Sequence, residues 1–113
     1  MKDNIKLYLA QFKNKKTSEN FYKIGITSKY DVLDRFKYDE YNGWNIRVMS
    51  SAYGPRDEVE TAEQYLLKRF PKNLWIEQKI SGVTEIVQLT SSQFQECMEL
   101  INEYKHKWYK ERS

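Results

Sequence analysis

Apolar and polar residues alternate with the period of a β-strand in the first half of the chain. Such runs cover 5–12 and 21–27, with a loop rich in Lys, Asn, Ser and Thr between them, and a third begins at 44. Two short alternating runs joined by a polar loop are typical of a β-hairpin. Gly25 interrupts the second run, which indicates a bulge or a close backbone approach. We therefore expect strands over 5–12, 21–27 and 44–53.

Three other segments carry the period of an amphipathic helix. The first covers 31–40 and places Val32, Leu33 and Phe36 on its inner face. The second begins with Pro55 in its first turn, and its buried stripe is expected to be Val59, Ala62, Leu66 and Phe70.

The third helical segment is expected near the end of the chain. Ser92 and Gln95 have the spacing of a capping box at its start. Cys97, the single cysteine, falls on its apolar stripe, so we expect it to be a core residue.

This order of elements predicts a small α/β (α+β) fold. The expected domain spans 1–113, with a core over about 5–90 and an amphipathic C-terminal helix over about 91–110. A central antiparallel three-stranded sheet would be flanked by helices. A further short strand is expected over 83–89, and 72–82 suits either a strand or an anchoring segment.

The composition is that of an ordinary globular protein. Of 113 residues, 40% are hydrophobic and 31% are charged, which excludes a disordered or fibrous chain. No apolar run reaches the roughly 18 residues that a bilayer-spanning helix needs. Because the first residues also lack the apolar core of a secretory signal, we expect a cytoplasmic protein with no membrane partner.

The charge is unevenly distributed. Residues 1–56 hold 11 Lys and Arg against 6 Asp and Glu, or +5, and residues 57–113 hold 8 against 10, or −2; the sum is +3. The basic excess lies with the predicted hairpin, and acidic residues cluster at 57–63. A basic face beside carboxylates suits a polyanionic substrate and a metal. A solvated surface of uneven charge is the simpler alternative.

Four side chains have the chemistry of phosphodiester hydrolysis. Tyr8 and Lys23 lie in opposite arms of the hairpin, and a nearby ammonium would favour a phenolate that acts as general base. Arg35 could hold phosphate oxygens through its guanidinium fork. Glu63 flanks the apolar helix stripe and could hold one Mg²⁺, which accepts a single carboxylate together with waters and phosphate.

Each of these residues also has a structural interpretation. Tyr8 could be a half-buried strand aromatic, and Lys23 could be an edge charge that prevents strand pairing. Arg35 and Glu63 could form surface ion pairs.

In order along the chain, these residues resemble the GIY-YIG nuclease family. Leu-Tyr-Leu at 7–9 stands where the family has G-I-Y, and Lys-Ile-Gly at 23–25 stands where it has Y-I-G. Arg35 matches the arginine of the family's first helix, and Glu63 matches its metal-binding glutamate. In its lysine at the second motif the chain resembles some restriction-enzyme and phage-type members of the family, which also carry lysine there. The resemblance covers about 5–90.

The resemblance implies a metal-dependent endonuclease that hydrolyses DNA. Tyr8 would be the general base aided by Lys23, Arg35 would bind the phosphate, and Glu63 would bind Mg²⁺ or Mn²⁺. Glu85, in a segment similar to a phage-type motif, is a second candidate ligand. The cations expected to contact the DNA backbone are Lys13, Lys15, Lys16, Lys29, Lys37 and Arg47.

The first motif lacks the family's glycine, which leaves a second function open. A catalytically inactive module on the same fold would bind nucleic acid or a protein partner. Without a separate recognition domain in this chain, we expect either low sequence specificity or dependence on a protein partner or a homodimer.

Overall fold

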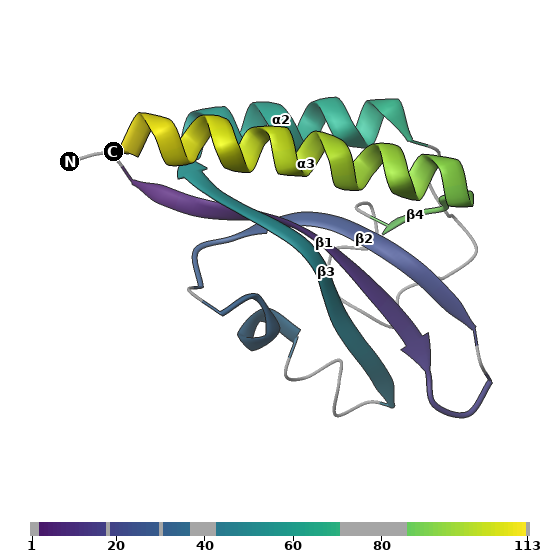
Figure 1. The fold of residues 1–113 in the computed structure, drawn as a ribbon. Helices are drawn as coiled ribbons and strands as arrows, with labels where there is room; N and C mark the ends of the chain where they lie inside the picture. Colours follow the sequence, from purple (N-terminus) through teal and green to yellow (C-terminus); the bar gives the residue numbers. More distant parts are fainter. Residues whose placement is uncertain (1–2, 18, 30, 37–42, 71–85, 113) are drawn as a thin grey trace.

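The computed structural model describes residues 3–17, 19–29, 31–36, 43–70 and 86–112. They form an α+β fold with a four-stranded antiparallel sheet in the order β3-β1-β2-β4 (Figure 1). The strands are β1 (Asn4–Asn14), β2 (Asn20–Thr27), β3 (Trp44–Pro55) and β4 (Ile86–Val87). The helical elements are the 3₁₀ helix η1 (Val32–Phe36) and the α-helices α2 (Arg56–Arg69) and α3 (Ser91–Arg112).

The three strands predicted from alternation are confirmed, and the sheet contains a fourth. Ile86 and Val87 pair with Lys23 and Tyr22 on the outer edge of β2. A paired edge satisfies backbone groups that an open strand would expose. Residues 83–85 of the expected short strand, and the whole of 72–82, lie outside the described residues.

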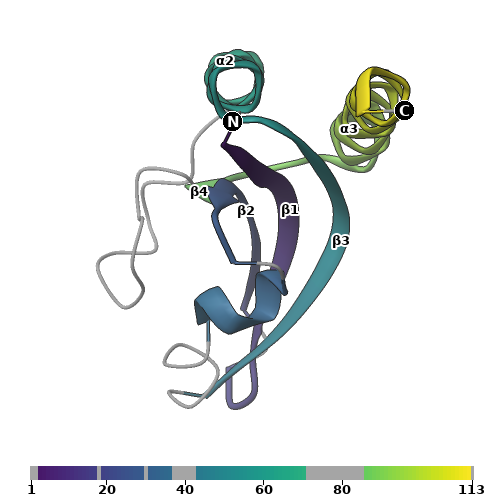
Figure 2. The same ribbon diagram turned by 90° about the vertical axis from the view of Figure 1, so that its left-hand side faces the viewer.

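The two α-helices cover one face of the sheet, and η1 lies on the other (Figures 1 and 2). Because successive residues of a strand point to opposite faces, β1 contributes to both cores. We call the α-helical side the helix face; Leu7, Leu9 and Ile24 pack there. We call the opposite side the motif face, where Tyr8 and Phe12 pack with η1.

The stripe predicted for α2 is confirmed, since Val59, Ala62, Leu66 and Phe70 are all buried on the helix face. The helix ends at Arg69, and Phe70 is extended at φ −112° and ψ 145°. This backbone conformation is the one that a following proline favours, and residue 71 is proline.

The capping box of α3 lies two residues earlier than predicted. Thr90 N–H donates to Oε1 of Gln93 at 2.9 Å, and Gln93 N–H donates to Oγ1 of Thr90 at 3.2 Å. The prediction of Ser92 and Gln95 is therefore wrong, because Thr90 and Gln93 have the same spacing and stand where the helix begins. None of the helices in the described ranges is long and apolar enough to cross a membrane.

The helix predicted over 31–40 is a 3₁₀ helix in its described part. Asp31 begins it, since its Oδ1 accepts from the N–H of Leu33 at 3.0 Å. Val32 and Phe36 are buried as predicted, but Leu33 is exposed. A 3₁₀ helix has three residues per turn, so the residue after Val32 points well away from the core. Residues 37–42 lie outside the described part of the chain.

One irregularity bends the sheet, and it is not at Gly25. The pairing of β1 with β2 is continuous through Gly25, which stands opposite Tyr8. The register shifts instead between β1 and β3, where Leu9 pairs with Ser50 and Ala10 pairs with Val48. Such a bulge increases the local twist, and Met49 packs against the helix face.

Candidate functional site

Tyr8 and Lys23, which the sequence placed in opposite arms of the hairpin, share the motif face. Tyr8 pairs with Gly25, and Ala10 pairs with Lys23, so the phenol and the amine occupy diagonal positions on adjacent strands. Diagonal neighbours in an antiparallel sheet lie within reach of long side chains. Tyr22, the other aromatic of this segment, faces the helices and contacts Phe94 with ring centroids 5.1 Å apart.

Phe36 of η1 contacts both members of this pair. Its ring lies edge-on to Tyr8 with centroids 5.4 Å apart, and the Lys23 Nζ lies 5.0 Å from its centroid. The second distance is that of a cation–π contact. Tyr8, Lys23 and Phe36 all have 0% of their surface exposed. The pair is therefore enclosed in an aromatic core. Tyr8 is not a half-buried strand aromatic, and Lys23 is not an exposed edge charge.

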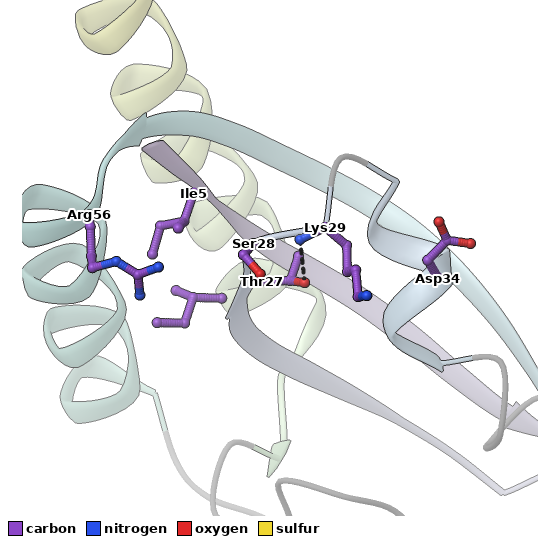
Figure 3. A pocket seen from close by; sticks show the side chains of 7 residues that line it. Ile5, Thr27, Ser28, Lys29, Asp34 and Arg56 are labelled. Atoms are coloured by element: carbon purple, nitrogen blue, oxygen red, sulfur yellow. Dashed lines mark hydrogen bonds between the residues drawn. The ribbon is translucent and has the colours of Figure 1, made fainter. Parts of the chain in front are cut away.

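A hollow lies at the C-terminal end of β2, past the residues that share a strand face with Lys23 (Figure 3). Thr27 also lies on that face, since Lys23, Gly25 and Thr27 alternate along the strand. The hollow has a volume of about 300 Å³. Its lining residues are Ile5, Ile26, Thr27, Ser28, Lys29, Asp34 and Arg56.

The hollow has the polar groups of an anion site. Arg56 stands at one end and Asp34 at the other, and the hydroxyls of Thr27 and Ser28 lie between them with Lys29 (Figure 3). The Thr27 hydroxyl accepts from the N–H of Lys29 at 3.0 Å, which fixes the chain after the strand. Arg56 also pairs with Asp3. Among the described lining residues there are two cations and one carboxylate, and Arg56 binds Asp3 through Nε, so its other guanidinium N–H groups are the donors it could offer to a phosphate oxygen.

Sequence reasoning missed most of this hollow. It selected Lys29 but neither Thr27 nor Arg56. Thr27 could have been found, because it has the two-residue period of Lys23 and Gly25 on β2. Arg56 had no local signal, since only the pairing of β1 with β3 brings the start of α2 to this end of the sheet.

The other two predicted catalytic residues lie on the helical elements. Arg35 belongs to η1, and its side chain lies outside the described part of the structure. Glu63 lies on α2 beside the buried Ala62; it is half-buried, and its Oε2 is fully buried. The sequence prediction that Glu63 flanks the apolar stripe is thus confirmed. The helix that carries Glu63 packs on the helix face, whereas Tyr8 and Lys23 lie on the motif face. Convergence of the three side chains stays a prediction.

The acidic groups limit the kind of metal site that the described residues could form. No three or more His, Cys, Asp or Glu side chains gather for a metal in the described ranges. A single partly buried carboxylate such as Glu63 fits Mg²⁺, which keeps several waters and shares its coordination with substrate phosphate. Glu85 lies outside the described residues.

The six cations predicted to bind DNA do not form one group. Lys13 and Arg47 lie on the helix face near the hairpin turn, and Lys15 and Lys16 lie in the turn itself. Lys29 lies at the opposite end of β2. Lys37 lies outside the described residues.

Cys97 is a core residue, as predicted. It is fully buried among the residues of the helix face. Burial, together with the nearby Glu96 carboxylate, raises the pKa of its thiol to about 12. The reactive form of cysteine is the thiolate, so this thiol is not a candidate nucleophile.

No family model matches the chain, and comparisons with curated proteins and with solved structures give no match either. The resemblance to GIY-YIG nucleases thus rests on the sequence motifs alone.

Proposed function

We propose that the protein is a GIY-YIG-type endonuclease that hydrolyses DNA with the help of one divalent metal ion. The observation that carries the proposal is the placement of Tyr8 and Lys23 on one sheet face at diagonal positions, both against Phe36. The positive charge of a neighbouring ammonium favours the phenolate, which is the form that takes up a proton as a general base.

The remaining parts of the reaction are assigned to other groups of the protein. The hollow with Lys29 and Arg56 would hold a phosphate of the backbone near the end of the motif face. Glu63 would hold Mg²⁺ or Mn²⁺, which neutralises charge that develops on the phosphate and the leaving oxygen. Arg35 would contact non-bridging oxygens. No covalent intermediate is required.

A nicking assay on supercoiled plasmid tests the proposal. We expect nicking with Mg²⁺ or Mn²⁺ and none with a chelator. Tyr8→Phe keeps the ring that contacts Phe36 and removes only the hydroxyl, so the fold should persist while the rate falls by roughly 10²-fold or more. Glu63→Gln should abolish metal-dependent nicking.

Two matched variants control for the substitutions themselves. Tyr65→Phe and Glu60→Gln make the same chemical changes at exposed positions of α2, and both should nick at the wild-type rate. Circular dichroism of every variant separates loss of chemistry from loss of fold. Wild-type rates in Tyr8→Phe, or nicking that survives chelation, would contradict the proposed mechanism.

The complete burial of Tyr8 and Lys23 favours a second function, that of a non-catalytic module that binds nucleic acid. A general base must reach water and substrate, whereas a buried phenol and amine can simply maintain the core. Under this alternative, wild type and Glu63→Gln bind DNA equally, and folded protein cleaves nothing with any metal.

A further inference from the structure

The helix face changes character along β1. Beneath the helices it presents Leu7 and Leu9, and towards the hairpin turn it presents Gln11 and Lys13. In Figure 1 this end of the sheet extends away from both α-helices. The polar positions therefore coincide with the part of the face that the helices leave uncovered.

Strand register brings five polar side chains together on this uncovered part. Gln11 pairs with Arg47, and Lys13 pairs with Asn45 on one side and Asn20 on the other. With Ile46 these residues line a hollow of about 430 Å³. We call this the hairpin-end surface: Gln11, Lys13, Asn20, Asn45 and Arg47.

The adjoining turn adds two further cations and is held in place by hydrogen bonds. Oδ1 of Asn14 accepts from the N–H groups of Lys16 and Thr17 at 2.9 and 3.0 Å. The N–H of Lys15 donates to the carbonyl of Gly43 at 3.0 Å, which ties the turn to the start of β3. A fixed turn reduces the ordering cost when a ligand binds.

The charge of this end is strongly positive. Among the described side chains of the turn and the adjoining strand ends, four cations (Lys13, Lys15, Lys16 and Arg47) stand against the carboxylate of Glu19, a net +3. Glu19 already accepts from the Thr17 hydroxyl at 3.0 Å. Among the described residues no carboxylate lines the hollow, where amides alternate with cations.

We propose that the hairpin-end surface is a nucleic-acid docking site separate from the site of cleavage. Cations with interleaved amide donors are the groups that contact phosphates and base edges. The surface lies on the opposite sheet face from Tyr8 and Lys23, and at the other end of β2 from the hollow with Lys29 and Arg56. We therefore expect it to anchor the polymer and to take no part in the chemistry. The inference rests on the proposed function only in taking nucleic acid as the partner.

Fluorescence anisotropy in a chelating buffer measures docking without cleavage. The probes are a labelled duplex of roughly 20 base pairs and a single strand of the same length. For the double variant Lys13→Gln/Arg47→Gln, we expect about tenfold weaker binding at roughly 100 mM salt. Each lost phosphate contact should also lower the slope of log K against log salt by about 1. The two probes show whether the surface prefers a duplex or a single strand.

A matched double variant separates local contact from overall charge. Lys68→Gln/Lys105→Gln removes the same charge from exposed positions on α2 and α3 and should change the affinity less than twofold. Equal weakening in both double variants, or wild type that binds neither probe, would overturn the docking site. So would equal competition by polyglutamate, which carries charge but no phosphate or base.

A cleavage assay keeps this inference distinct from the proposed function. At saturating plasmid, Lys13→Gln/Arg47→Gln should nick with the wild-type rate constant while needing more DNA for half-maximal rate. A lowered rate constant at saturation would place the surface in the chemistry and contradict a separate dock. If the wild type bound nucleic acid but did not nick it, the docking site would be supported and the endonuclease proposal would be contradicted.

Discussion

At the residue scale, Gly54 and Trp108 show how closely α3 approaches the sheet. A Cβ built on Gly54 would lie 2.5 Å from Cδ2 and 2.7 Å from Cγ of the Trp108 indole. Trp108 is 1% exposed and stacks on Tyr104 with centroids 5.2 Å apart, so its ring is packed against the sheet. Glycine is required here by the close approach of a ring.

Gly54→Ala should therefore lower the free energy of unfolding by about 1–3 kcal/mol, the usual cost of overpacking. Urea denaturation measures this loss. In a Trp108→Leu background the same substitution should cost much less, because the ring that it meets is gone. Additive losses in the double variant would show that the clash is not the cause.

The candidate site was partly predictable at this scale. The sequence could place Tyr8 and Lys23 in opposite arms of one hairpin, but only the register of β1 with β2 puts both side chains on the same face. Their enclosure by Phe36 could not be predicted, since it depends on where η1 returns to the sheet. Arg56 and Thr27 were missed for the same reason, as their neighbours come from distant segments.

At the element scale, α3 depends on a reciprocal cap that satisfies two of the backbone groups of its first turn. Thr90 and Gln93 exchange hydrogen bonds at 3.2 and 2.9 Å. The predicted partners, Ser92 and Gln95, differ in position by only two residues. A capping box is defined by spacing, and the chain offers that spacing twice, so the sequence could not choose between them.

Thr90→Ala should lower the free energy of unfolding by about 1 kcal/mol. Ser92→Ala removes a hydroxyl from the same turn and should change the free energy of unfolding by no more than about a few tenths of a kcal/mol. Thermal or urea denaturation of the pair decides the position of the cap. Equal losses in the two variants would contradict the assignment of Thr90 as the N-cap.

At the scale of the whole molecule, the helix face is one core formed by the sheet and both α-helices. Arg69 joins the helices through its guanidinium, which contacts both carboxylate oxygens of Glu96 at 2.8 Å. Cys97 follows Glu96 in the sequence, and its side chain is fully buried. Its thiol therefore reports on separation of the helices from the sheet.

Cys97 should resist thiol reagents in the native protein at about pH 8 and react fully in denaturant. Burial raises the pKa of the thiol from 9.0 to about 12, so above pH 9 it ionises in the unfolded chain but not in the native one. Stability is thus expected to fall as the pH rises from 9 towards 12. Cys97→Ala should reduce that fall in a denaturation series across these pH values. Fast labelling of native protein would contradict burial of the thiol.

The sequence by itself determined the elements that have strong local signals. Alternation placed β1, β2 and β3, and helical spacing placed α2 and α3 with their buried stripes, because each signal depends on residues within one element. Only the tertiary structure decided which side chains meet. Strand register, the bulge at Met49 and the return of η1 place Lys23 over Phe36 and set Lys13 beside Arg47 on the other face. These contacts join segments far apart in the chain. Their geometry depends on how those segments pack together, which the sequence pattern within one element does not determine.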